Sequence, residues 1–190
     1  MPTLLQDAVA DLSLWSVGQW KTGKFVQTAP LLYKDVQDLI QLIPSSEVEE
    51  CYTACAPNVF TGSGEEDRKG IMFNVSDSAR VSLELLEDCV RELLKKDYPK
   101  IADWRHSSCK PPAQYSGSIK GKIKLSSCKF FDADGKPVEA PEEWKGLTCV
   151  PVVQPSVYLQ KNSAGLILEV VGLKLGERKT VTPDIQVDFV

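Results

Sequence analysis

Three lysines, Lys120, Lys122 and Lys124, alternate with small or apolar residues in the run SGSIKGKIKL. In a β-strand, alternate residues share a face and lie about 7 Å apart. This spacing is close to that of phosphates along an extended single strand of nucleic acid, where each contact with a lysine releases counterions. The run therefore predicts a strand that follows a nucleic-acid backbone. Changing all three lysines to alanine should lower the salt slope of binding by up to ~3 phosphate equivalents.

Aromatic residues lie near these and other lysines, and each can stack on a base with a stabilisation of about 1–3 kcal/mol. Some flank the lysine run, and others surround an earlier Lys-Thr-Gly-Lys turn. The candidate nucleic-acid-binding residues are Lys120, Lys122, Lys124, Lys129, Lys21, Lys24, Trp20, Phe25, Tyr115 and Phe130. The alternative interpretation is structural, because lysines keep an edge strand from aggregating and large aromatic rings pack in cores.

Motifs for catalysis are missing from the sequence. It contains no HExxH, P-loop, GxSxG or strand-linked GxGxxG, and His106 is its one histidine, which removes most histidine-based acid–base schemes. The acidic clusters lie in charged loops typical of solvated surface. Asp132-Ala-Asp134-Gly135 resembles the start of a calcium loop, but its flanks are strand-like rather than helical. We therefore expect no enzymatic activity and no cofactor.

Cysteines leave a zinc site open as an alternative. Cys51 and Cys55 are four residues apart, and His106 precedes Cys109 by three. These residue types are the usual zinc ligands, but no cysteine pair forms a CxxC, and buried structural cysteines are common. A zinc-dependent enzyme built on these four residues is therefore ranked last, and no metal is expected.

The composition limits the classes of protein to which this chain can belong. The chain has 190 residues, of which 43% are hydrophobic and 25% charged, as in an ordinary soluble globular protein. It has no apolar run of about 18 residues, and its N-terminus, with Asp7 and no basic region, is not a secretory signal. We therefore expect no membrane association and an intracellular location, cytoplasmic or nuclear (in the host cell if viral), with reduced cysteines. The net charge of −4 argues against polyanion binding by the whole surface but allows a local basic groove.

The elements that must position these residues are mostly strands. Residues 147–175 predict two long strands joined by a turn at 162–165, apolar at nearly every position and so covered on both faces. Residues 14–20 and 24–28 predict a first hairpin, residues 71–75 a short buried strand, and residues 117–131 the lysine strand. We expect a polar loop at 61–70 and a turn-rich connection at 132–146.

Residues 78–96 form the strongest helical pattern. Ser76 or Asp77 is placed to cap the helix, Lys95 and Lys96 lie in its last turn, and Pro99 ends it. The residues expected on its buried face are Val81, Leu83, Leu86, Cys89 or Val90, Leu93 and Leu94. Residues 34–43 also have helical spacing, with Val36, Leu39, Ile40 and Ile43, and a second helix is predicted from residue 45. Both of these segments fit strands equally well.

The order of elements is that of a five-stranded OB-like barrel with one helix between the third and fourth strands. The expected fold class is therefore mainly β with helix (α+β), in a single domain spanning 1–190. Residues 34–60 are treated as a helical or extended insertion, and 176–190 as a C-terminal tail. OB barrels often bind single strands, but fold alone does not assign function.

A family resemblance supports this fold. The segment DADGKPVEAPEEWKGLTCVPVVQPSVYLQKNSAGLILEVVGLKL, preceded by MFNVSDSARVSLELLEDCVREL and SGSIKGKIKL, resembles the OB-fold single-stranded DNA-binding proteins of T7-type phages and of large eukaryotic DNA viruses. The similarity covers about the last 120 residues and is a pattern rather than a strict motif. Many members end in a long acidic tail, whereas this chain ends in PDIQVDFV, so tail-mediated recruitment of partners is in doubt.

The resemblance implies binding of single-stranded DNA without sequence specificity, in DNA replication, recombination or repair. It also implies replication or recombination proteins as partners, and a homo-oligomer. A different class of function is kept as the first alternative: a structural or virion-associated β protein that self-assembles, with its lysines on a solvated edge.

Overall fold

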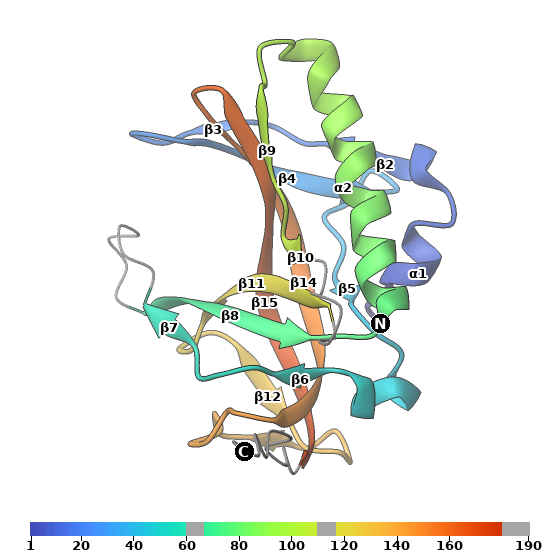
Figure 1. The fold of residues 1–190 in the computed structure, drawn as a ribbon, viewed down its shortest axis with the longest axis vertical. Coiled ribbons are helices and arrows are strands. Elements are labelled where there is room, and N and C mark those ends of the chain that lie inside the picture. Colours follow the sequence, from blue (N-terminus) through green and yellow to red (C-terminus); the bar gives the residue numbers. More distant parts are fainter. Residues whose placement is uncertain (60–66, 110–116, 180–190) are drawn as a thin grey trace, which may run out of the picture.

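The computed structural model describes residues 1–59, 67–109 and 117–179. Its centre is an antiparallel hairpin of two long strands, β14 (Leu147–Gln160) and β15 (Ser163–Arg178). In Figure 1 this hairpin forms the long vertical axis of the molecule, with the long helix along one side. The predicted hairpin is confirmed, and β15 takes in the first residues of the predicted tail.

The hairpin turn differs from the prediction. Gln160 pairs with Ser163, so the turn is Lys161–Asn162, and Lys161 adopts a φ of 53°. The predicted turn at 162–165 is wrong because Ala164 and Gly165 already lie in the ladder of β15. Asn, Ser, Ala and Gly all occur in turns, and nothing local shows that three of the four continue the strand.

Five strands close into a ring around the core. β14 pairs with β6 (Tyr52–Thr53), β6 with β8 (Arg68–Asn74), β8 with β11 (Ser118–Lys124), and β11 with β15, which returns to β14. The helix α2 (Asp77–Asp97) follows β8 and precedes β11, as predicted. This arrangement confirms the predicted mainly β barrel with an inserted helix.

Shorter elements extend the ring. In chain order they are β1 (Thr3–Leu4), α1 (Leu5–Ala8), the 3-10 helix η1 (Leu12–Leu14), β2 (Trp15–Val17), β3 (Lys21–Thr22), β4 (Gln27–Tyr33), β5 (Ile40–Gln41), the 3-10 helix η2 (Ser45–Glu50), β7 (Asn58–Val59), β9 (Asp103–Arg105), β10 (Ser108–Cys109), β12 (Lys129–Phe131) and β13 (Pro137–Val138). β4 and β5 pair with β14, whereas β9 and β12 pair in parallel with β15. No helix among these described residues is both long enough and apolar enough to cross a membrane.

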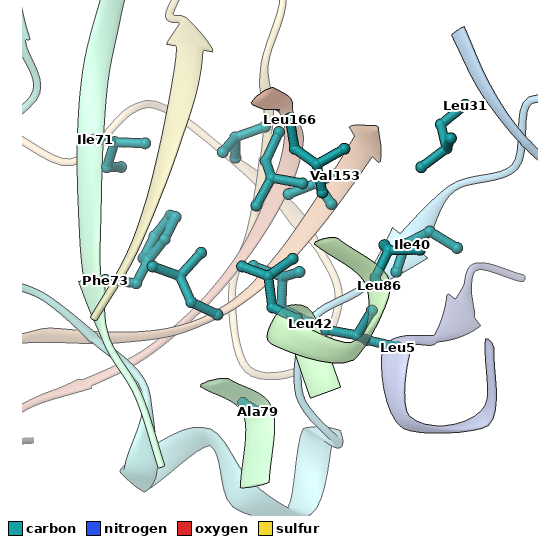
Figure 2. Packing of buried hydrophobic residues seen from close by; sticks show 14 of the residues in the cluster. Leu5, Leu31, Ile40, Leu42, Ile71, Phe73, Ala79, Leu86, Val153 and Leu166 are labelled. Atoms are coloured by element: carbon teal, nitrogen blue, oxygen red, sulfur yellow. The ribbon is translucent and has the colours of Figure 1, made fainter. Parts of the chain in front are cut away.

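The core fills the space between α2 and the ring (Figure 2). Phe73 of β8, Leu86 of α2 and Val153 of β14 are each almost fully buried there. α2 buries the residues Ala79, Leu83, Leu86, Glu87, Val90 and Leu94, which recur every three or four positions. Val81, predicted for this face, is instead 44% exposed.

Residues 34–43 do not form the predicted helix. Lys34 and Asp35 adopt positive φ values of 53° and 63°, which is incompatible with a right-handed helix, and the chain then enters β5, where Ile40 pairs with Val153. The alternative prediction, that this segment is extended, is correct for the two residues of β5. The second predicted helix is limited to the 3-10 turns of η2.

Two strand predictions also change in detail. The first hairpin is longer than predicted and shifted, because β4 begins at Gln27 and pairs with both β2 and β3. The single strand predicted over 117–131 is two strands, β11 and β12, separated by a turn in which the amides of Ser127 and Cys128 donate to the carbonyl of Lys124.

Thiol reactivity tests this core. Burial raises the pKa of Cys128 to about 12, and a hydrogen bond with Cys51 together with burial holds the pKa of Cys149 well above its usual value. Because the thiolate is the reactive form, we expect iodoacetamide at neutral pH to alkylate partly exposed Cys55 in the native protein and to spare Cys128 and Cys149. Peptide mass mapping with and without denaturant provides the measurement. Native alkylation of Cys149 as fast as Cys55 would contradict the packing.

Candidate nucleic-acid interface

The outer face of β11 carries the three lysines that the sequence singled out. Ile119, Gly121 and Ile123 are buried, whereas Lys120 is exposed and Lys122 and Lys124 are half-buried on the other face. The predicted alternation is therefore confirmed. Arg68 of β8 lies directly across the ladder from Lys124 and adds a fourth cation to this face.

A hollow of about 530 Å³ lies over this face. Strands β4, β8, β9, β11, β14 and β15 all contribute to its lining, and we call it the basic groove. The charged side chains among its described lining residues are the cations Arg68, Arg105, Lys120 and Lys122. Arg68 and Arg105 form ion pairs with Glu169 and Asp103, which are not among the lining residues. The groove is thus locally positive in a protein whose net charge is −4, and a positive surface attracts a polyanion.

The groove runs across the strands along a row of residues that are paired from one strand to the next. Lys21 pairs with Thr28, Thr28 with Tyr158, Tyr158 with Gly165, and Gly165 with Arg105. Paired residues in a sheet point to the same face, so the row brings Lys21, Tyr158 and Arg105 onto one surface. A smaller hollow of about 240 Å³, which Lys21 and Arg68 both line, continues the groove toward β3.

Tyr158 supplies the aromatic surface of the groove. A Cβ atom placed on Gly165 would lie 2.9 Å from Cε1 of Tyr158 and 2.6 Å from the carbonyl oxygen of Arg105, so glycine is what lets the ring lie against the strand. Burial raises the pKa of the phenol, and Asp103 adds to this effect while Arg105 opposes it. The ring therefore stays uncharged at neutral pH and does not repel a phosphate.

Ion pairs orient the two arginines. Nη2 of Arg68 lies 2.6 Å from Oε2 of Glu169, and its Nε also donates to the same oxygen at 3.1 Å. Nε of Arg105 lies 3.5 Å from Oδ2 of Asp103. The guanidinium of Arg68, bound through two nitrogens, presents its remaining N–H groups in a fixed fork that suits a phosphate, whereas Arg105 makes a single contact between exposed side chains.

Lys122 is half-buried on β11. Burial and the nearby charge of Arg68 lower its pKa, and Glu169 partly offsets them. A phosphate brought into the groove would favour the charged form of this lysine and lower the repulsion between it and Arg68. The groove is therefore electrostatically disposed toward an anion.

A buried carboxylate holds the groove wall in place. Glu87 of α2 has a fully buried side chain, and it accepts hydrogen bonds from the Ser107 amide at 2.6 Å and the Ser108 hydroxyl at 2.9 Å. Nδ1 of His106 lies 3.1 Å from the same carboxylate. Three consecutive residues after Arg105 are thus fixed to the helix, and Arg105 and His106 are positioned on the wall as a result.

Two of the predicted aromatic candidates have structural roles. Phe130 is 6% exposed and packs edge-on against Trp144, with ring centroids 6.0 Å apart, so its predicted stacking role is not supported. Trp20 is half-buried against Tyr98, edge-on at 5.6 Å. Tyr115 lies outside the described residues. A pattern of aromatic residues in sequence does not show which rings face the core.

The remaining candidates lie apart from the groove. We call β3, β4 and the loop of residues 23–26 between them the β3–β4 arm. Phe25, in this loop, is 74% exposed, and Nζ of Lys24 lies 5.2 Å from its ring centroid. Lys129 is exposed on β12 and is not among the residues that line the groove. Thus Lys120 and Lys122 line the groove and Lys21 its extension, whereas Lys24 and Phe25 belong to a separate surface.

Sequence reasoning missed three groove residues, namely Arg68, Arg105 and Tyr158. The sequence pattern predicts a polar loop at Arg68 and, at Tyr158, a hairpin covered on both faces. That expectation fails for the outer half of β14, where Gln154, Ser156, Tyr158 and Gln160 form the less buried face. The period of two among these residues was a usable signal for an exposed face.

The cysteine and histidine set of the zinc alternative is dispersed. Cys51 is buried beside Cys149, whereas His106 contacts Glu87 of α2. Across the part of the chain that the structure describes, no three potential metal-ligating side chains come together. The side chain of Cys109 is outside that part.

Comparisons with known proteins bear on the fold. No family model matches the chain, and no curated protein matches its sequence. Among solved structures, it is similar to gp2.5, a single-stranded DNA-binding protein encoded by bacteriophage T7, with a TM-score of 0.54 and 15% identity over 71% of this chain and 90% of that one. The single-stranded DNA-binding protein of bacteriophage Enc34, solved in complex with ssDNA, gives a TM-score of 0.49 and 14% identity over 86% and 97% of the two chains. The first likeness confirms the OB-like fold expected from the family resemblance.

Proposed function

We propose that this protein binds single-stranded DNA without sequence specificity and acts without catalysis in DNA replication, recombination or repair. The observation that carries the proposal is the basic groove, which cations from β8, β9 and β11 line together with Tyr158. The fold shared with gp2.5, named as a single-stranded DNA-binding protein, supports the same function.

The residues of the groove suit a single strand rather than a duplex. Lys120, Lys122 and Arg105 can contact phosphates in any sequence, and the exposed face of an unpaired base can stack on Tyr158 because every base has a π-face. A base in a duplex is already stacked and is not free to contact the ring. Sequence-independent binding of a single strand follows from these two contacts.

The salt dependence of binding tests the proposal. Each lysine or arginine contact with a single-stranded phosphate contributes about 0.7 to the slope of log K against log salt. Changing exposed Lys21, Arg105 and Lys120 together to glutamine should therefore lower the slope by roughly 2. Fluorescence anisotropy with labelled oligo-dT and oligo-rU of about 30 nucleotides measures both the slope and the preference for DNA.

Three exposed lysines away from the groove, Lys96, Lys136 and Lys145, provide the matched control. Their change to glutamine alters net charge equally and should leave the slope nearly unchanged. If wild-type protein does not bind oligo-dT at low salt, the proposed function is wrong. Equal losses of slope in both triple variants would instead place binding outside the groove.

A further inference from the structure

A second hollow, of about 580 Å³, lies at the tip of the central hairpin. Three segments far apart in sequence form it: the β3–β4 tip with Lys24 and Phe25, the end of α2 with Tyr98 and Lys100, and the hairpin turn with Lys161. We call it the tip cleft. In Figure 1 the end of α2, the hairpin turn and the β3–β4 arm all lie at the upper end of the molecule.

The tip cleft and the basic groove lie on opposite faces of the same two strands. Thr28 and Tyr158 are paired and line the groove, whereas the adjacent pair, Gln27 and Leu159, lines the cleft. Successive residues of a strand point to opposite faces, so the β4–β14 ladder separates the two hollows. Val26, just before β4, borders both hollows, and a chain that passes over it could connect them.

The lining of the tip cleft suits a nucleotide. Lys24, Lys100 and Lys161 outnumber Asp97, the one acidic side chain among its described lining residues. Leu159 and the half-buried Tyr98 give it an apolar part, and Phe25 is available to a base because the residue is 74% exposed. Asp97 and the negative end of the α2 dipole disfavour phosphate beneath the helix. Phosphates are therefore expected near the lysines and a base against Phe25.

We propose that the tip cleft binds the continuation of the DNA strand that occupies the basic groove, so that one strand bends around the β3–β4 arm. This inference rests on the proposed function, because it assigns a second nucleotide subsite to the same ligand. Phe25 stacks on a base there, and Lys24, Lys100 and Lys161 neutralise its flanking phosphates. A strand too short to pass Val26 contacts the groove alone.

Oligonucleotide length separates the two subsites. Site sizes in OB folds run from about 4 to 16 nucleotides. An oligo-dT of about 5 nucleotides should therefore occupy the groove alone, whereas one of about 20 nucleotides should occupy both the groove and the tip cleft. Phe25→Ala should weaken binding of the long oligonucleotide roughly 5- to 140-fold and leave binding of the short one unchanged.

The double change Lys100→Gln and Lys161→Asn should lower the salt slope by about 1.4 for the long oligonucleotide and leave the slope for the short one unchanged. Asparagine is chosen at 161 because it tolerates positive φ.

Leu85→Ala on α2 is the matched control for Phe25→Ala, since Leu85 is also an exposed apolar residue, at 45%. It should leave both oligonucleotides unaffected. Unchanged binding of the long oligonucleotide by the cleft variants would overturn the inference, and so would equal weakening at both lengths. Failure of the proposed function is distinguishable, because wild-type protein would then bind neither length.

Discussion

Replacing Tyr158 with alanine is expected to weaken binding of oligo-dT by roughly 5- to 140-fold, because base stacking on an aromatic ring contributes about 1–3 kcal/mol and about 1.4 kcal/mol corresponds to a tenfold change in affinity. The ring lines the same groove as the cations of β9 and β11 and lies against Gly165. Because no phosphate contact is removed, the salt slope should stay as in the wild type. Anisotropy titrations at several salt concentrations measure both quantities.

Tyr158→Phe is the control for this change. It keeps the ring and removes the hydroxyl, so affinity should stay close to that of wild type if stacking is the main contribution. A large loss in Tyr158→Phe would show that the hydroxyl binds the DNA directly. Thermal unfolding of both variants is required beside the titrations, because the side chain is half-buried. Wild-type affinity in a folded Tyr158→Ala variant would remove Tyr158 from the interface.

Replacing Glu87 with alanine is expected to reduce the free energy of unfolding by about 3–5 kcal/mol. The fully buried carboxylate accepts bonds from Ser107 and Ser108 and contacts His106, and its loss leaves buried donors without an acceptor. For a chain of this size the melting temperature should fall by roughly 6 to 20 °C. Circular dichroism during heating gives the measurement.

The conservative change Glu87→Gln should cost less, since its amide oxygen can still accept from the Ser107 amide. Glu92→Ala, on the exposed side of the same helix, is the control and should change the melting temperature little. Because the residues bonded to Glu87 directly follow Arg105, Glu87→Ala should also weaken DNA binding below the melting temperature. A melting temperature equal to that of wild type would mean that water satisfies this site.

Much of the architecture was predictable because local patterns decide it. The long hairpin, the alternation in β11 and the helix after β8 follow from β-branched runs, period-two lysines and a 3.6-residue period. The segment 34–43 was not predictable in this way. Its apolar residues fit a helix, but Ile40 is buried through pairing with Val153, a contact formed by a distant part of the chain.

The candidate site was predictable only where one strand contains it. Lys120 and Lys122 share β11, so their common face follows from strand geometry. Arg68, Arg105 and Tyr158 come from three other strands, and their proximity depends on the order and register of the sheet. The burial of Phe130 against Trp144 likewise depends on tertiary packing.

The central hairpin also sets when this fold can form. β4 pairs across the sheet with β14, as in Pro30 with Ser156, and β11 closes onto β15, so early strands complete their pairing only with the last described strands. During synthesis the N-terminal strands therefore leave the ribosome long before their partners exist. Contacts this distant in sequence slow folding and leave strand edges open in the meantime. We expect the barrel to close only after residue 178 has left the ribosome, and the nascent chain to need protection from aggregation until then.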